Sequence, residues 1–137
     1  MPELAKENSK AGLEAFIAYW YAQLSYSYET GSTEHLTPLS SLTCALCTSL
    51  GKGVESAWED GRWVAGATIK SATIESDFNP SVSVQVATVQ VIQEPIEIRA
   101  HDGSLYQVPT AATNSASRAA LTFENQNWVL TGLGLIR

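Results

Sequence analysis

Hydrophobic positions recur at intervals of three and four residues near the start of the chain. Within residues 6–29 the apolar members of this repeat are Leu13, Phe16, Ile17, Trp20, Leu24 and Tyr28. Such spacing is typical of an amphipathic α-helix, so one long helix is predicted to open the chain. Gly31 is expected to end it, because glycine readily adopts the left-handed conformation of a helix C-terminus.

The helical pattern weakens after Gly31. A turn or two of helix is predicted within residues 32–39. A third helix is predicted over residues 46–59, although Gly51 and Gly53 disfavour it because each interior glycine costs up to about 1 kcal/mol.

From Asp60-Gly61 onward the apolar residues alternate, which predicts strands. The alternation changes parity once within residues 63–76 and once within residues 82–91. In the second run Val82, Val84 and Val86 share one parity, and Val89 and Val91 take the other. One extra residue in a strand re-aims every later side chain. We therefore expect a β-bulge in each run, a strongly curved sheet, and a turn at residues 77–80.

Two hairpins are predicted to complete the chain. The first spans residues 96–108 around Asp102-Gly103, and the second spans residues 120–136 around residues 125–127. Because helices come first and strands follow, the fold class is α+β, with N-terminal helices packed on a strongly curved, mostly antiparallel sheet. We expect one domain over residues 1–137, with residues 1–5 as a disordered remnant of a linker.

Charge excludes some partners. The net charge is −6, and no two basic residues are adjacent. Nucleic-acid binding depends on clustered cations, and so does attraction to anionic membranes. The sequence therefore argues against nucleic acid and against a basic membrane patch.

Two parts of the chain resemble the nuclear-transport-factor-2-like cone folds. These are the long first helix with its continuation Tyr28-Glu29-Thr30-Gly31-Ser32-Thr33-Glu34-His35-Leu36, and the closing strand Asn127-Trp128-Val129-Leu130. More narrowly, residues 8–31, 44–47 and 61–66 resemble a family of small actinobacterial lipoproteins of unknown activity. The resemblance covers nearly the whole chain.

This resemblance implies an extracytoplasmic protein that is anchored by a lipid in its full-length form. The lipid-bearing cysteine is absent from this chain. It further implies a non-enzymatic accessory or binding domain of the bacterial cell envelope, whose partner is a small hydrophobic ligand or an envelope protein. Because cone folds often dimerise through the outer face of the sheet, a homodimer is a further expectation, and residues 86–91 carry the semi-polar alternation that suits it.

Cys44 and Cys47 allow several interpretations. A zinc site would need two more ligands, and only His35 and His101 are available. A thioredoxin-like pair needs a preceding strand in a βαβ unit. Reduced thiols suit a cytosolic protein. A structural disulfide is favoured if the small domain is exported, as the resemblance implies.

No catalytic set, metal site or cofactor motif is predicted. The alternative function is a small cone-fold enzyme, similar to isomerases or dehydratases, acting on a hydrophobic substrate. It would need a carboxylate inside an apolar pocket, where burial raises the pKa, and Glu75 is the candidate. Aromatic residues would line a pocket between helix and sheet. The ligand-binding candidates are Phe16, Tyr19, Trp20, Trp63 and Glu75.

Overall fold

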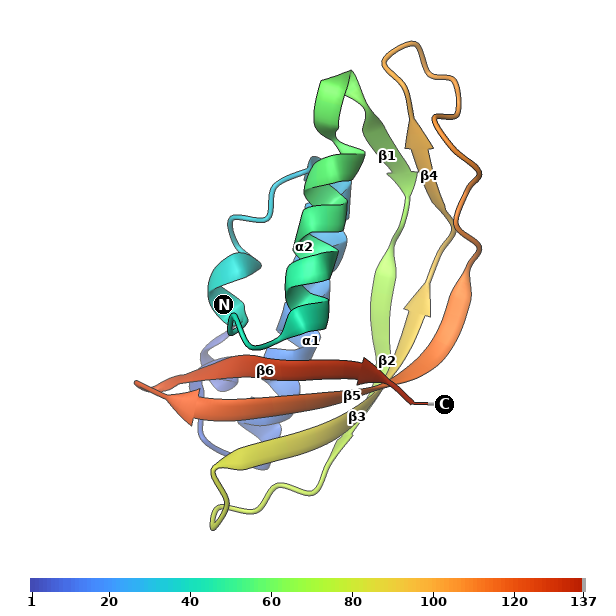
Figure 1. Ribbon diagram of the computed structural model, residues 1–137. Helices are drawn as coiled ribbons and strands as arrows, with labels where there is room; N and C mark the ends of the chain where they lie inside the picture. Colours follow the sequence, from blue (N-terminus) through green and yellow to red (C-terminus); the bar gives the residue numbers. More distant parts are fainter. Residues whose placement is uncertain (137) are drawn as a thin grey trace.

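Two α-helices lie against two antiparallel sheets in the structure, a computed structural model that describes residues 1–136 (Figure 1). The helices are α1 (Lys10–Thr30) and α2 (Ala45–Ala57), with 3-10 turns η1 (Glu3–Lys6), η2 (Thr37–Leu39) and η3 (Glu59–Gly61). The strands are β1 (Trp63–Gly66), β2 (Ile69–Ser76), β3 (Val84–Gln93), β4 (Ile96–Arg99), β5 (Thr113–Glu124) and β6 (Asn127–Leu135). Strands β2-β3-β5-β6 form one sheet and β1-β4 the other. The predicted α+β class is confirmed.

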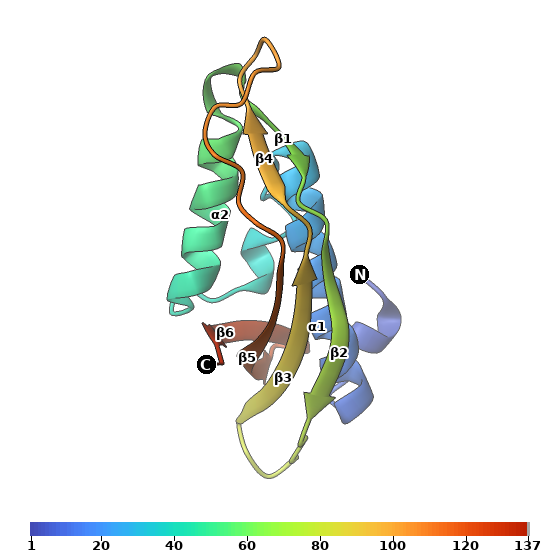
Figure 2. The ribbon, with the colours of Figure 1, turned by 90° about the vertical axis from the view of Figure 1, so that its right-hand side faces the viewer.

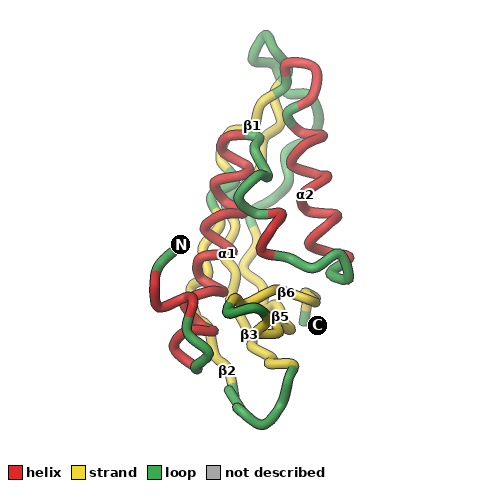
Figure 3. Tube along the Cα trace, turned by 90° about the vertical axis from the view of Figure 1, so that its left-hand side faces the viewer, coloured by secondary structure: helices red, strands yellow, loops and turns green. Residues whose placement is uncertain are grey.

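Helix α1 ends at Gly31 as its sequence predicts, but it begins at Lys10, later than the predicted residue 6. The Ser9 hydroxyl accepts a hydrogen bond from the Gly12 amide at 3.0 Å, which caps the N-terminus. At the other end Gly31 has φ +80°, and a β-carbon there would lie 2.7 Å from the Trp58 ring. Glycine therefore serves both the backbone conformation and the close packing. Figure 3 shows α1 running along the long strands, with α2 beside it.

The two later helical segments also form. Residues Thr37–Leu39 make only a 3-10 turn, and α2 runs from Ala45 to Ala57. Neither Gly51 nor Gly53 has a neighbouring atom within 4 Å of the position a β-carbon would take. Both glycines face open space, so the buried side of α2, which includes Val54 and Ala57, stabilises the helix without them.

The two sheets share one long, kinked hairpin. Strand β1 continues into β2 and strand β3 continues into β4, as Figure 2 shows. The kink lies at Gly66 and Ala67, which have φ +76° and +65°, and the Ala67 amide donates to the Pro95 carbonyl oxygen at 3.0 Å. A β-carbon at Gly66 would lie 2.4 Å from the same oxygen. Glycine is therefore required where the sheet bends.

One of the two predicted bulges is confirmed and the other is wrong. Strand β2 has a register shift between Ser71 and Thr73. Strand β3 pairs with β5 without interruption from Val84 to Gln93. Its change of parity arises because both faces carry apolar residues: Val84 and Val86 are exposed, whereas Val89 is buried.

The two C-terminal hairpins differ in outcome. The β5–β6 hairpin is confirmed, with Asn125 and Gln126 at φ +50° and +65° in its two-residue turn. The hairpin over residues 96–108 is only partly formed. Strand β4 pairs with β1, and the returning chain makes only isolated bridges, Arg99 with Leu105 and Ile96 with Thr110. Residues 104–112 are exposed, so nothing on that segment buries an apolar face.

The first residues join the fold. Residues 1–5, for which the sequence suggested disorder, contain most of η1, and Ala5 is 1% exposed within the main core. The Trp128 indole donates a hydrogen bond to the Glu7 carbonyl oxygen at 2.8 Å. The last strand therefore holds the segment that leads into α1.

Candidate binding surface

Two of the ligand-binding candidates lie in the core between α1 and the four-stranded sheet. Phe16 and Trp20 are 0% and 1% exposed. They pack against Leu121 and Leu130 and leave no space that would admit a water molecule. The Trp20 indole donates to the Ser40 hydroxyl at 2.8 Å. These two residues therefore stabilise the fold, and the predicted pocket between helix and sheet is filled by side chains.

The other three candidates lie apart from one another. Tyr19 is half-buried on the side of α1, and Trp63, at 37% exposed, lies on the two-stranded sheet. Glu75 is exposed on β2 and pairs with Thr88 of β3, next to the buried Ser76. Because side chains alternate along a strand, Glu75 points away from the core. The five candidates do not line one pocket.

The interior contains few polar groups. Buried Tyr21 has a hydroxyl with no hydrogen-bond partner among residues 1–136. Burial raises the pKa of this hydroxyl, and the nearby Ser117 side chain opposes that rise more weakly. In the same stretch of chain no Asp or Glu side chain is buried. The isomerase-like alternative requires such a carboxylate, and the described interior does not supply one.

Neither a metal-binding group nor a membrane-spanning helix is found in the part of the chain that the structure describes. No three His, Cys, Asp or Glu side chains come together in a group that could hold a metal ion. No helix there has both the length and the apolar character needed to cross a membrane.

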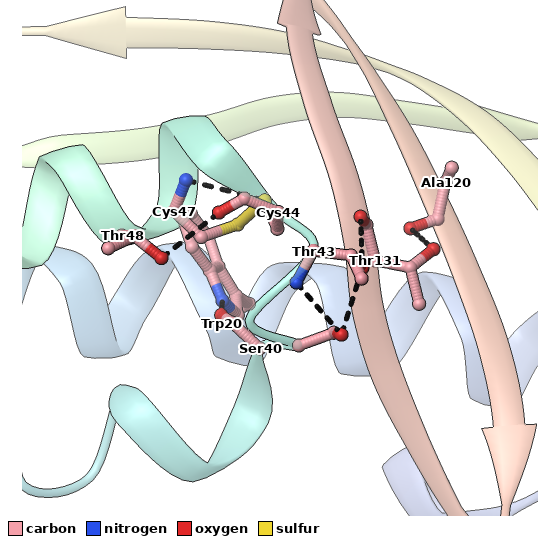
Figure 4. Close-up of a disulfide and its surroundings, with 9 residues drawn as sticks. Trp20, Ser40, Thr43, Cys44, Cys47, Thr48, Ala120 and Thr131 are labelled. Atoms are coloured by element: carbon pink, nitrogen blue, oxygen red, sulfur yellow. Dashed lines mark hydrogen bonds between the residues drawn. A yellow bond between two sulfur atoms is a disulfide. The ribbon is translucent and has the colours of Figure 1, made fainter.

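Cys44 and Cys47 form a disulfide, as predicted, with Cα atoms 5.2 Å apart (Figure 4). Both cysteines are buried, and the Cys44 sulfur accepts a hydrogen bond from the Cys47 amide at the start of α2. The preceding residues attach to the edge of β6. The Ser41 amide donates to the Leu130 carbonyl oxygen at 2.8 Å, and the Thr43 hydroxyl donates to the Thr131 carbonyl oxygen at 3.3 Å. The disulfide therefore fixes the joint between α2 and a strap, residues 40–43, that covers part of this edge.

The four-stranded sheet turns its second face to solvent. We call this the outer face: it consists of the side chains that alternate with the buried ones, namely Thr73, Glu75, Val84, Val86, Thr88, Gln90, Ile92, Ala116, Arg118, Ala120 and Thr122. Val84, Val86 and Ile92 are 49%, 37% and 37% exposed. Exposed apolar side chains gathered on one face are typical of interaction surfaces.

A groove of about 500 Å³ runs along part of the outer face. Glu75 and Arg118 lie on either side of Thr88 in a single cross-strand row, because Thr88 pairs with both. Neither charged side chain forms an ion pair with another residue in 1–136. The groove lining also includes Asp77, Val82, Val84, Val86 and Ile136.

Sequence reasoning missed Arg118. The signal that could have found it is its parity in the strand, which is opposite to that of Ala119 and Leu121, although Ala120 shares it. The pairing with β3 is what brings Arg118 level with Glu75, far earlier in the chain. No local pattern contains that register.

Solved structures with little sequence similarity share this fold. The intermembrane space region of the chloroplast protein ARC6 aligns over 93% of this chain and 96% of its own, with TM-score 0.63 and 8% identity. Aln2 from a Streptomyces species aligns over 92% and 90%, with TM-score 0.58 and 9% identity. A cystatin-like protein from Caulobacter vibrioides aligns over 88% and 87%, with TM-score 0.51 and 10% identity. These likenesses show the fold, a cystatin-like or nuclear-transport-factor-2-like cone.

Sequence comparison adds the family. No curated protein matches the chain. A family model does match residues 1–134, and the chain therefore belongs to DUF6318, a family of unknown function.

Proposed function

We propose that this protein is a non-enzymatic partner-binding domain of the bacterial cell envelope, and that its partner binds on the outer face of the sheet. The observation that carries the proposal is the pair of half-exposed residues Val84 and Val86, which line a groove of about 500 Å³, with Ile92 also exposed on the same face further along β3. Water-exposed apolar surface of this kind gains free energy when a partner covers it.

The disulfide supports the location. Disulfides persist in oxidising compartments and are rare in the cytosol, and Cys44 and Cys47 are bonded here. Together with the resemblance to small lipoproteins, this favours an extracytoplasmic domain. Attachment through a lipid on the full-length protein is part of the proposal.

A second copy of the chain is the partner that the charges fit. Consider a two-fold axis that runs parallel to β3 and passes above Thr88, in the space between the outer faces of the two copies. It would place Glu75 of each copy opposite Arg118 of the other, because the two charges flank Thr88 in one row. An interface of this kind repeats every contact twice. The valines of β3 would then lie against the partner's outer face.

Light scattering of the purified protein over a range of concentrations tests self-association. We expect a dimer that Arg118→Glu weakens, since both reciprocal pairs become like-charge contacts. The double variant Glu75→Arg with Arg118→Glu should restore the dimer, since it exchanges the charges. Lys52→Glu on α2 is the control and should leave the dimer unchanged. A monomer at every concentration would contradict the choice of partner.

Photo-crosslinking in cells tests the binding function itself. A crosslinking amino acid at Val86 reports on the outer face, and one at Ser49 on the exposed side of α2 is the control. We expect crosslinked products from position 86 only, recovered with the envelope fraction of cells that produce the full-length protein. Equal crosslinking from both positions, or recovery in the cytosol, would contradict the proposal.

A further inference from the structure

A second hollow lies on the other side of the molecule, on the solvent side of α1. It has a volume of about 440 Å³ and is lined by Tyr19, Ala22, Gln23, Tyr26 and His35. The first four residues follow the helical repeat and form one continuous strip along α1. His35 comes from the loop after the helix, and its ring centre lies 6.2 Å from that of Tyr26. We call these five residues the tyrosine groove.

Packing within the chain explains only part of this strip. Tyr19 is half-buried and packs against the main core, whereas Tyr26 is 45% exposed. Within residues 1–136, the side chains of the groove's tyrosines, glutamine and histidine form no hydrogen bond; Gln23 and Tyr26 accept bonds only through their backbone carbonyls. Tyrosine is also a poorer helix former than the Lys, Glu or Gln that usually cover solvent-facing positions. The groove therefore presents aromatic area and free polar atoms to solvent.

The lining chemistry restricts the ligand. No residue of the groove carries a fixed charge, and the net charge of the protein is −6. Anionic ligands are therefore disfavoured. The phenol hydroxyls and the Gln23 amide each both donate and accept hydrogen bonds, and the ring nitrogens of His35 add further hydrogen-bonding atoms. A sugar hydroxyl does the same, and the apolar face of a pyranose ring stacks on an aromatic ring.

We propose that the tyrosine groove binds a neutral linear oligosaccharide laid along α1. Tyr19 and Tyr26 are seven residues apart, which is about 10.5 Å along a helix axis. Adjacent pyranose rings lie closer together than this, so the first and third of three linked rings match the spacing. Each of these two rings would then stack on one tyrosine, with Gln23 hydrogen-bonded to the ring between them. The volume of the groove falls within the usual size range of ligand sites, about 300–1,000 Å³. This inference does not depend on the outer face.

Nuclear magnetic resonance titration of the intact, disulfide-bonded protein tests the inference. The probes are neutral tetrasaccharides, namely those of N-acetylglucosamine, cellulose, amylose and mannan. We expect at least one to give saturable shifts of the backbone amides of residues 19–26 and 35. Tyr26→Ala should weaken that binding by about tenfold or more, which is the loss of one stacked ring. Gln23→Ala should weaken it less.

Tyr106→Ala is the matched control, because Tyr106 is also exposed, at 54%, but lies on the loop after β4 and does not line the groove. It should leave saccharide binding unchanged. Tyr26 is half-exposed, so Tyr26→Ala is expected to fold, and an unchanged amide spectrum away from the groove will verify this. No shift with any probe, or binding that Tyr26→Ala leaves unaltered, would overturn the proposal. Shifts of the same amides by a proline-rich peptide alone would overturn it too, since aromatic grooves also accept such peptides.

Discussion

The inner and outer faces of the four-stranded sheet are built from the same strands but have opposite surroundings. Strand β3 contributes Ala87 and Val89 to the inner face, where both are almost fully buried under α1. It contributes Val84 and Val86 to the outer face, where both are exposed. Valine therefore occupies both sides of one strand. The apolar character of a strand does not identify the face that the helices cover.

The comparison extends to β5. Its inner residues Ala119 and Leu121 are 1% and 0% exposed, whereas Arg118, between Ser117 and Ala119, is exposed. The inner face is therefore apolar at these two positions, and the outer face combines valines with a charge. A surface of mixed character can stay in water as a monomer and still gain from a partner.

The largest expected difference between the faces is in stability. Leu121→Ala removes a fully buried side chain and should lower the free energy of unfolding by about 3 kcal/mol, within the usual range for such cavities. Val84→Ala on the outer face should change it by less than about 0.5 kcal/mol, as most surface substitutions do. Urea denaturation at low protein concentration measures both.

Protein concentration sharpens this test. If the outer face binds a second copy, Val84→Ala will become destabilising at concentrations where the wild type associates, because association stabilises the folded state. The deficit of Leu121→Ala will persist at every concentration. Equal losses for the two variants in the dilute regime would contradict the assignment of the faces.

Much of the fold follows from local patterns. The spacing of Leu13, Phe16 and Trp20 predicts α1 because one face of a helix must be buried, and Gly31 marks its end. The β5–β6 hairpin is likewise encoded by its turn. The sequence could not show that β3 is regular. A strand with apolar residues on both faces has the same change of parity as a strand with a bulge. The kink at Gly66 and Ala67 depends on the Pro95 carbonyl oxygen, which is distant in sequence.

The candidate site was less predictable. Cys44 and Cys47 are close in sequence, and their bond was foreseen. The sequence offers Glu75 as the carboxylate of a pocket, whereas its pairing with Thr88 places it on the outer face of the sheet. Tyr19 does line a groove, but on the solvent side of α1. Which surfaces stay uncovered is decided by the packing of whole elements, which no short motif records.

The disulfide provides the second test, at the edge of β6 where the two faces meet. The double variant Cys44→Ser with Cys47→Ser should lower the free energy of unfolding by about 2 kcal/mol at most, since the closed loop is short. The melting temperature should fall by several degrees. Calorimetry of the oxidised wild type and the variant measures the change.

Thr43→Val is the matched control for that variant. It removes the hydrogen bond from the Thr43 hydroxyl to Thr131 and keeps the disulfide, so the loss should be smaller than that of the double variant. Two free thiols in the non-reduced wild type by mass spectrometry would contradict the bond. Insulin reduction that the wild type catalyses and the double cysteine variant does not would show that the bond acts in redox chemistry.

A smaller effect than that of the disulfide is expected at a defect of the inner face. The buried Tyr21 hydroxyl has no hydrogen-bond partner within the described chain, and leaving a polar group in that state costs about 1–3 kcal/mol. Tyr21→Phe removes the hydroxyl and keeps the ring in contact with Trp20, whose ring centre is 5.0 Å away. We expect the variant to be more stable than the wild type by about 1 kcal/mol at neutral pH, at the lower end of that range. A loss of stability would indicate that the hydroxyl has a partner in solution.

The same residue makes stability depend on alkaline pH. Burial raises the pKa of the Tyr21 hydroxyl in the folded state, with the Ser117 side chain opposing it more weakly. The unfolded tyrosine titrates near its ordinary pKa of about 10. Above that pH the unfolded chain has lost the proton while the folded chain still holds it, so stability falls as pH rises. Below it both states are protonated and the residue contributes no pH dependence.

Tyr21→Phe should therefore show a shallower loss of stability above about pH 10. The remaining slope is due partly to Tyr28, whose pKa is also raised by burial. Parallel slopes for wild type and variant in urea denaturation across this range would mean that the Tyr21 hydroxyl reaches water.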